Sequence, residues 1–289
     1  MKDYLVILAG SPRGGDDTWN SLYKYVVNHL DADLALCCSD RWNQDTSLFE
    51  KADYKWIFSE MNDYYDYYRK NYSGSWKDYF ETGRDTGLLS SGSVHFVFKD
   101  IILKNYMNIL KKYKYIIYTR FDQKHSDYHP KGVKNKILIP EGEDYFGVCD
   151  RHALLPIDFC EDFLSICEFI NNPKSLENYD RFNNCETTFK KHLESTDLFN
   201  SVMRYKRSQF TTSLKGEHTN WRVAKYRLYF YKQLLIKYPD EFMDSIANLI
   251  NKKGIIYLNL NEPKLLLNYI YLKARETLGN YKKLWLKKK

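Results

Sequence analysis

The stretch Asp3–Ser39, DYLVILAGSPRGGDDTWNSLYKYVVNHLDADLALCCS, decides the fold of this 289-residue chain. Its first eight residues form an apolar, β-branched run that ends in the polar turn SPRGGDD. TWNSLYKYVVNHL then has apolar residues at helical spacing, and DADLALCCS is a second apolar run. Strand, helix and strand in this order predict a βαβ opening and therefore a parallel sheet covered by helices.

Similar patterns continue along the chain. ADYKWIFSEM, KYIIYTRFD and EDYFGVCD predict three further strands, and VHFVFKDIILKNYMNILKKY predicts a long helix that Ser91 or Ser93 can cap. Helices are expected afterwards, in DFCEDFLSICEFI, NCETTFKKHLES and RVAKYRLYFYKQLLIKYPDEFMDSIANLI. We expect an α/β fold with a mostly parallel, Rossmann-like sheet flanked by helices. Residues 1–225 would form the catalytic domain, and residues 226–289 a helical C-terminal extension packed on it.

The charge of the chain is concentrated near its C-terminus. The formal net charge is +7, and the last eleven residues, GNYKKLWLKKK, contain five lysines and no acid. The rest is nearly neutral, which argues against nucleic acid as a partner. Leucines and a tryptophan between the lysines are typical of a weak contact with an anionic membrane surface, although a frayed, solvated terminus has the same composition.

The cysteines and the hydropathy pattern predict a cytoplasmic protein (host cytoplasm for a viral one). The six cysteines fit no zinc-binding spacing and lie mostly in apolar runs, as buried reduced thiols do. No apolar stretch approaches the ~18 residues that span a bilayer, and YLVILAG is too short for a signal peptide.

Polar loops follow the expected strands at Gly10–Gly15, Thr119–Asp127 and Cys149–His152. In open α/β sheets, ligands bind beyond the carboxyl ends of the parallel strands. We therefore expect these three loops to converge on one crevice.

A cation and a carboxylate end the central strand, in the segment YIIYTRFDQK. Arg120 can bind phosphate oxygens in bidentate fashion. Asp122, with Asp127, His125 and His129 close behind it, could hold Mg²⁺ or Mn²⁺ against a diphosphate. Alternatively, Arg120 and Asp122 pair with each other.

Several segments resemble the GT-A-type nucleotide-sugar glycosyltransferases. YKYIIYTRFD is similar to their strand YDYVIRTRPD, whose acid stands in place of the metal-binding DxD motif. GRDTGLLSSGS and the long helix take the place of the elements that line the nucleotide-sugar pocket. YFGVCDRHALLPIDF resembles the later strand and acceptor segment, NCETTFKKHL resembles NPExLLxxHL, and GEHTNWR is similar to a Thr-Arg-Trp signature. The resemblance covers roughly residues 4–225 and extends to uncharacterised viral and bacterial glycan-building proteins.

This resemblance implies a function and a set of site residues. The chain would transfer a sugar from a UDP- or GDP-linked donor to a hydroxyl of a glycan acceptor in polysaccharide biosynthesis, with Mn²⁺ or Mg²⁺ at Asp122. The residues implied to bind the nucleotide sugar are Gly10, Ser11, Arg13, Asp40, Arg84, Ser91 and Arg120. Acceptor binding falls to Arg151, His152 and Trp221.

The general base of an inverting transfer would be a carboxylate on the acceptor side. Asp150 is the first choice for this role and Glu186 the second, while an ion pair of Asp150 with Arg151 or His152 is the structural alternative. The chain has Arg-Phe-Asp where the family has Asp-x-Asp, so Arg120 could take over part of the role of the cation.

Two other functions fit parts of the sequence. GSPRGGDDTWNSL is similar to the phosphate loop GxPRSGTTWLxxL of PAPS-dependent sulfotransferases, which cradles phosphate at a helix N-terminus. Asp16 and Asp17 would repel that phosphate by about 1–4 kcal/mol each at ~4 Å. A catalytically inactive, glycan-binding relative is the third possibility, because the second acid of the DxD motif is missing.

Overall fold

The computed structural model describes residues 2–81, 91–177, 184–217, 227–228 and 234–287, without the side chains of residues 81, 91–92, 227–228 and 279–287. The chain forms two compact units. The sheet unit consists of Met1–Pro12, Val27–Phe121 and Pro130–Tyr205, and the helical unit of Arg13–Val26, Asp122–His129 and Lys206–Lys289. The boundary expected between residues 225 and 226 lies outside the described residues.

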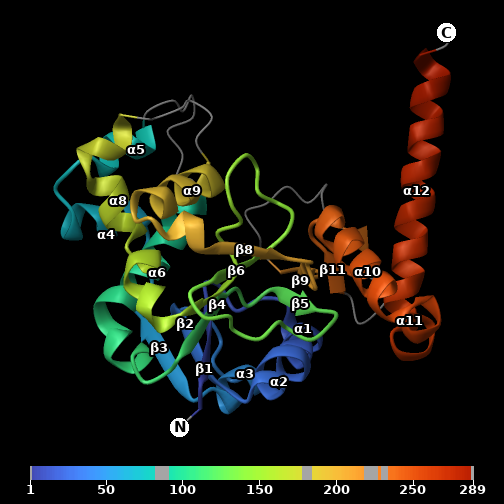
Figure 1. Ribbon diagram of the computed structural model, residues 1–289, viewed down its shortest axis with the longest axis horizontal. Coiled ribbons are helices and arrows are strands. Elements are labelled where there is room, and N and C mark those ends of the chain that lie inside the picture. The colour runs from blue at the N-terminus through green and yellow to red at the C-terminus, as the bar shows by residue number, and fades with distance from the viewer. Residues whose placement is uncertain (1, 82–90, 178–183, 218–226, 229–233, 288–289) are drawn as a thin grey trace. The chain divides into compact units, whose positions relative to one another are not determined.

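The sheet unit is built on a seven-stranded sheet of order β3-β2-β1-β4-β7-β6-β8 (Figure 1). β1 (Tyr4–Ala9) pairs in parallel with β2 (Ala32–Ser39) and with β4 (Tyr115–Thr119). β2 also pairs in parallel with β3 (Tyr54–Phe58). The chain is therefore an α/β protein with a mostly parallel sheet flanked by helices, as the apolar runs predicted, and it is compatible with a Rossmann-like fold.

The remaining strands of this sheet differ from the prediction. β7 (Ala153–Pro156) runs antiparallel to β4 and to β6 (Ile137–Pro140), and β6 pairs in parallel with β8 (Val202–Tyr205). The strand expected at EDYFGVCD is wrong: this segment is a loop in which Glu143, Tyr145 and Phe146 have φ values of 55°, 42° and 72°. Positive φ values are incompatible with an extended strand.

Helix α6 (Ser91–Leu110) is the long helix that the sequence predicts, and it packs on the sheet. The other helical segments of the sheet unit are shorter. They are α2 (Asn28–Leu30), α3 (Ser47–Lys51), α4 (Tyr64–Asn71), α5 (Trp76–Glu81), η2 (Ile157–Phe159), α7 (Cys160–Leu164), α8 (Ile166–Asn171), η3 (Pro173–Leu176), α9 (Cys185–Ser195) and η4 (Leu198–Ser201). The expected helices at 158–170 and 184–195 are thus confirmed, the first broken at Ser165.

The tyrosine-rich segment before α5 belongs to the core of this unit. The hydroxyls of Tyr67 and Tyr72 each donate a hydrogen bond of 2.7 Å to Asp100, a fully buried acid on α6. The ammonium of Lys104 lies 2.9 Å from the same carboxylate. Buried charge is tolerated where it is paired and hydrogen-bonded in this way. These tyrosines therefore pack the interior and satisfy a buried acid.

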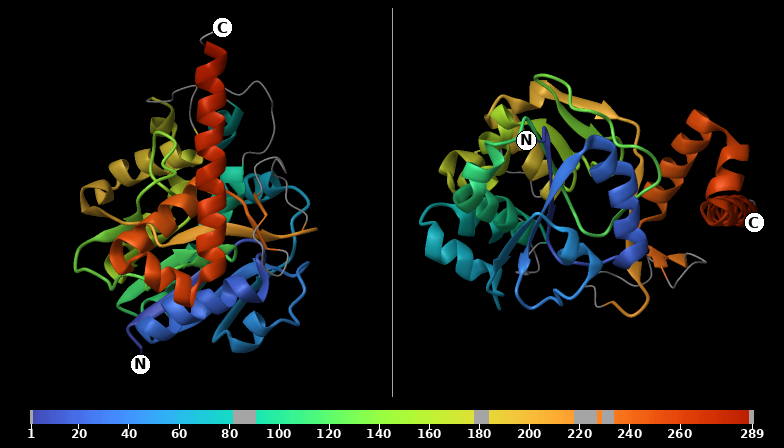
Figure 2. Two further views of the ribbon diagram at one scale, coloured as in Figure 1. Left: turned by 90° about the vertical axis from the view of Figure 1, so that its right-hand side faces the viewer. Right: turned by 90° about the horizontal axis from the view of Figure 1, so that it is seen from below.

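The helical unit contains an antiparallel sheet of order β10-β11-β9-β5. Its strands are β5 (Gln123–His125), β9 (Gln209–Leu214), β10 (Arg227–Leu228) and β11 (Leu234–Ile236). Its helices are α1 (Gly15–Leu22), α10 (Pro239–Lys253), α11 (Ile255–Asn261) and α12 (Pro263–Lys287), and the π-helical turn η1 (Tyr23–Val27) follows α1. Figure 2 shows α12 as one long, straight helix.

The single helix expected over residues 222–250 is wrong, because part of it forms β10 and β11. In β11 the side chains of Leu234 and Ile236 alternate inward and pack in a core that includes Phe210 and Phe242. Helix α10 begins only at Pro239, whose fixed φ suits the first turn of a helix. Tertiary packing thus overrides the apolar pattern that favoured a helix here.

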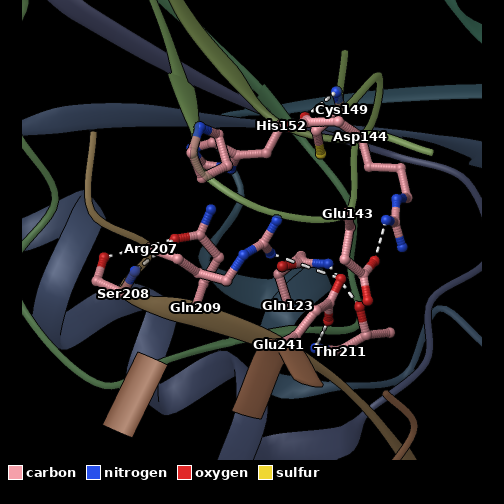
Figure 3. Close-up of polar contacts among 12 residues, drawn as sticks. Gln123, Glu143, Asp144, Cys149, His152, Arg207, Ser208, Gln209, Thr211 and Glu241 are labelled. Carbon is pink, nitrogen blue, oxygen red and sulfur yellow. Dashed lines mark hydrogen bonds and ion pairs between the residues drawn. The ribbon is translucent and has the colours of Figure 1, made fainter. Parts of the chain in front are cut away.

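The interior of the helical unit is unusually polar. Arg207 Nη1 lies 3.5 Å from Glu241 Oε1, and both side chains are almost fully buried. The other oxygen of Glu241 accepts a hydrogen bond of 2.6 Å from the amide of Thr211, whose hydroxyl accepts one of 2.8 Å from Gln123 (Figure 3). These contacts join β5, β9 and α10 into one network. A substitution of Arg207 or Glu241 would remove one charge from this buried ion pair.

The predictions for the cysteines and for membrane spans can be compared with the structure. All six cysteines are free thiols, five of them buried, as their sequence context predicted. Among the described residues, the helices are too short or too polar to pass through a bilayer.

Candidate functional site

The carboxyl ends of β1, β2 and β4 lie at one edge of the sheet unit, as expected for parallel strands. The turn after β1 begins at Gly10, whose φ of 120° favours glycine and whose amide donates to Cys37 O at 3.0 Å. Ser11 follows in this turn and is half-buried. Asp40 follows β2; it is exposed, and its carboxylate accepts a hydrogen bond of 2.9 Å from the amide of Glu60.

The segment 150–152 reaches this same edge for a reason that the sequence did not predict. It precedes β7, and β7 runs antiparallel to β4, with Tyr118 opposite Ala153. The start of β7 therefore lies beside the end of β4. The contact between them is a hydrogen bond of 2.9 Å between His152 Nδ1 and the hydroxyl of Thr119, both buried.

Asp150 and Glu186 are the two predicted general bases, and in the folded chain the charge of Asp150 affects the pKa of Glu186. Glu186 lies in the first turn of α9, and its carbonyl accepts a hydrogen bond of 3.1 Å from Val148. The pKa of Glu186 is raised to about 7, chiefly by burial and secondly by the charge of Asp150, while the charge of Arg151 opposes the rise. Asp150 is 3% exposed, and its Oδ2 has no hydrogen-bond partner among the described residues.

A glycine allows this arrangement. A Cβ on Gly147 would lie 2.0 Å from the backbone carbon and oxygen of Glu186. Only glycine can therefore hold the loop against the start of α9 at this point. The sequence stretch Phe146–Asp150 predicted neither this contact nor the pairing of the two acids.

Lys99 is a member of the site that sequence reasoning missed. It lies on α6, is fully buried, and donates a hydrogen bond of 3.0 Å to the carbonyl of Asp150. Its ammonium lies 4.5 Å from the ring centre of Tyr118 and 5.2 Å from that of Phe189. Burial lowers the pKa of Lys99, and the charge of Asp150 opposes this shift. A single lysine inside the apolar run VHFVFKDII was the available signal.

Ion pairs fix the loop that carries Asp150. Arg151 pairs with Glu143, and both are almost completely buried. Arg204 on β8 lies 2.9 Å from Asp144. Asp144 also accepts a hydrogen bond of 3.2 Å from the amide of Cys149 (Figure 3). Arg151 thus pairs with Glu143, whereas the structural alternative was an ion pair of Asp150 with Arg151 or His152.

The two residues that end the predicted central strand are assigned to different compact units of the chain. Arg120 is half-buried in the sheet unit, whereas Asp122 belongs to the helical unit and is 3% exposed. The carbonyl of Asp122 accepts hydrogen bonds of 2.8 Å and 3.2 Å from the amide and hydroxyl of Thr212. A carboxylate that holds a cation against a bound diphosphate must reach a ligand from outside the protein, and the burial of Asp122 does not support this role.

The described residues near Asp122 do not form a cluster of three metal ligands. Asp127 is occupied by an ion pair of 2.6 Å with Lys252 and by a second one with Lys253. His125 is buried. Within the described ranges, no three acids, histidines or cysteines come together as metal ligands. A metal at Asp122 stays a prediction, and no step proposed below uses it.

The loop compared with a sulfotransferase phosphate loop binds a carboxylate of its own chain. Gly14 and Gly15 have φ values of 96° and 66°, and the amide of Gly14 donates to Glu217 Oε1 at 3.1 Å. Arg13 is half-buried in the same loop, and its carbonyl accepts a hydrogen bond of 3.2 Å from the indole of Trp19. Glu217 occupies the position that a phosphate would need, which argues against this alternative.

Three predicted residues cannot be placed in the site. Arg84 and Trp221 lie outside the described residues, and so does the side chain of Ser91.

A surface groove of about 650 Å³ lies elsewhere in the sheet unit, where residues of α8, η3 and α9 line it, among them Phe169, Asn172 and His192.

No protein-family model matches the chain, and no curated protein matches it closely enough to count as a relative. The class that the geometry defines is an α/β protein with two interacting carboxyl groups near the carboxyl edge of its sheet, Asp150 buried and Glu186 half-buried.

Proposed function

We propose that this protein is a glycosyltransferase, which moves a sugar from a nucleoside diphosphate to a hydroxyl of a glycan acceptor. The observation that carries the proposal is the carboxylate pair Asp150–Glu186 at the edge where parallel sheets bind ligands. Paired acids whose environment places one pKa near neutrality are typical of general acid–base sites.

The pair supplies the base that the reaction needs. An acceptor hydroxyl must lose its proton as it attacks the sugar carbon, and a carboxylate within hydrogen-bonding reach can take it. Asp150 is the proposed base, because its Oδ2 has no hydrogen-bond partner within the described part of the chain. Glu186, with a pKa of about 7, changes the charge of the pair: its carboxyl carries a proton below that pH and is ionised above it.

Positive groups at the same edge are proposed to stabilise the leaving diphosphate. Arg120 follows β4 directly, and a guanidinium can bind two phosphate oxygens at once. Gly10 and Ser11, after β1, would border the nucleotide. Arg151 and His152 would face the acceptor. Preorganised charge of this kind is commonly the largest contribution to catalysis.

Release of the nucleoside diphosphate from a nucleotide sugar tests this proposal. The protein is incubated with UDP- and GDP-linked sugars, with and without oligosaccharide acceptors, and free UDP or GDP is measured. Asp150→Asn should lower turnover by at least about 100-fold, which is the contribution expected of a general base. Asp158→Asn, which removes an exposed acid after β7, is the matched control and should leave turnover unchanged.

Binding measurements separate this proposal from its alternatives. Thermal stabilisation by UDP or GDP that is lost in Arg120→Gln supports the transferase. Stabilisation by PAPS alone would contradict it in favour of a sulfotransferase. Glycan binding without diphosphate release from any donor would instead identify an inactive, glycan-binding relative.

A further inference from the structure

Large apolar side chains are exposed along α11 and α12 of the helical unit. On α11, Ile256 is 73% exposed and Leu260 75%. On α12, Leu267 is 59% exposed, Ile270 51% and Leu278 69%. Single exposed apolar residues are normal on a protein surface, but a contiguous set marks an interaction site.

The exposed residues of α12 lie on one face of the helix. Leu267, Ile270, Ala274 and Leu278 are separated by three, four and four residues, which is the spacing of a single helical stripe. The opposite face is already used, because Leu265, Asn268 and Leu272 are buried within the helical unit. The stripe is therefore a second apolar face, left over after the helix has packed on its own unit.

Helix α12 also extends beyond its packing partners. Every described side chain from Lys273 to Leu278 is exposed, and Figures 1 and 2 show this part of the helix continuing past α10 and α11. The part of α12 after Leu272 is about 15 residues long, and an isolated helix of that length is marginal in water. A helix that projects with an exposed apolar stripe gains stability when another surface covers the stripe.

The charge of this region indicates what that surface is. Residues 263–289 contain eight lysines and arginines and one acid, Glu276, which gives a formal charge of +7. The whole chain has the same net charge, so positive and negative residues balance elsewhere. Among the cations, Lys264, Lys273 and Arg275 are exposed on α12. A cationic helix with an apolar stripe is complementary to an anionic lipid surface.

We propose that α11 and α12 form a membrane-surface site that binds anionic phospholipid. The stripe would enter the boundary between headgroups and acyl chains, with the helix parallel to the bilayer, while the flanking cations contact the headgroup phosphates. A second copy of the chain is the less favourable occupant, because each copy would bring a charge of +7 to the contact. This proposal does not depend on the transferase activity.

Vesicle sedimentation of the full chain tests the site. The protein should bind vesicles of phosphatidylcholine mixed with phosphatidylserine, and bind vesicles of phosphatidylcholine alone at least tenfold more weakly. Ile270→Ser/Leu278→Ser should weaken binding by about tenfold per side chain. Lys273→Gln/Arg275→Gln should weaken it by about fivefold per cation and flatten the salt dependence. All four positions are exposed, so these variants are expected to fold.

A matched control and the contrary outcomes complete the experiment. Val133→Ser removes an exposed apolar side chain of the sheet unit and should leave vesicle binding unchanged. Equal binding to both kinds of vesicle, or binding to neither, would overturn the proposal. A dimer in light scattering that Ile270→Ser/Leu278→Ser abolishes, without vesicle binding, would show that a second copy covers the stripe.

Discussion

Replacing Glu186 by glutamine should stabilise the protein at alkaline pH and have little effect at acidic pH. The carboxyl of Glu186 is half-buried beside the charge of Asp150, and its pKa is raised from 4.5 to about 7. Because the folded protein holds this proton more tightly than the unfolded chain, ionisation of Glu186 opposes folding. The cost begins above pH 4.5, grows as the pH rises, and is complete above pH 7.

The size of the effect follows from the shift. Each unit of pKa difference corresponds to 1.36 kcal/mol, so a rise from 4.5 to about 7 costs about 3 kcal/mol of unfolding free energy at pH 8. Glutamine cannot ionise and has nearly the same shape, so Glu186→Gln should recover most of this free energy at pH 8. At pH 5 the folded wild-type protein is protonated at Glu186, and the two proteins should differ by less than about 1 kcal/mol.

Urea unfolding at several values between pH 5 and pH 8 measures this difference. Glu161→Gln, on the exposed first turn of α7, is the matched control and should show no pH-dependent gain. A Glu186→Gln variant that is no more stable than wild type at pH 8 would refute the argument. The reading of Asp150 and Glu186 as a coupled pair would then fail, whatever the activity of the protein.

Three further predictions concern other charged groups. Glu241→Ala should destabilise the helical unit by about 3–5 kcal/mol in urea unfolding, because it breaks a buried ion pair by removing one charge only. Arg207→Met/Glu241→Leu should recover much of this loss, and an unstable double variant would contradict the argument. His192 is buried and its pKa is lowered to about 4, so the free energy of unfolding should fall by up to about 3 kcal/mol as the pH drops from 6.5 to 4. His192→Gln should remove this part of the acid sensitivity. An unchanged dependence of unfolding free energy on pH would show that His192 is not its source. If the proposed transferase activity is found, its rate should rise with pH through about 7 and then level off. Asp150→Asn should lower the rate on this plateau and should not move the midpoint of the rise towards alkaline pH.

Local patterns in the sequence predicted the parallel part of the fold. The apolar runs of β1, β2, β3 and β4 are each bounded by turn residues, and those of the first two enclose a helical pattern. A strand in a parallel sheet is buried on both faces, so its own sequence is a nearly continuous apolar run. The same reasoning failed at β10 and β11, where packing against α10 and β9 decides the backbone conformation.

The candidate site was predictable only in part. Asp150 and Glu186 could be named from the sequence as acids near expected strand and helix ends. That they interact follows from a loop with positive φ values and from the close approach at Gly147, neither of which leaves a periodic signal. Lys99 was missed because its position in an apolar run is equally typical of a lysine at the edge of a buried helix face.

The sequence by itself determined the order of the first strands and helices, the carboxyl edge at which their polar turns meet, and the excess of positive charge in residues 263–289. These features depend on residues that are close together in the chain. Only the tertiary structure decided that β7 runs against β4, that Arg120 and Asp122 belong to different compact units, and that two acids 36 residues apart share one environment. Strand direction and long-range proximity are set by packing across the whole chain, so no short stretch of residues encodes them.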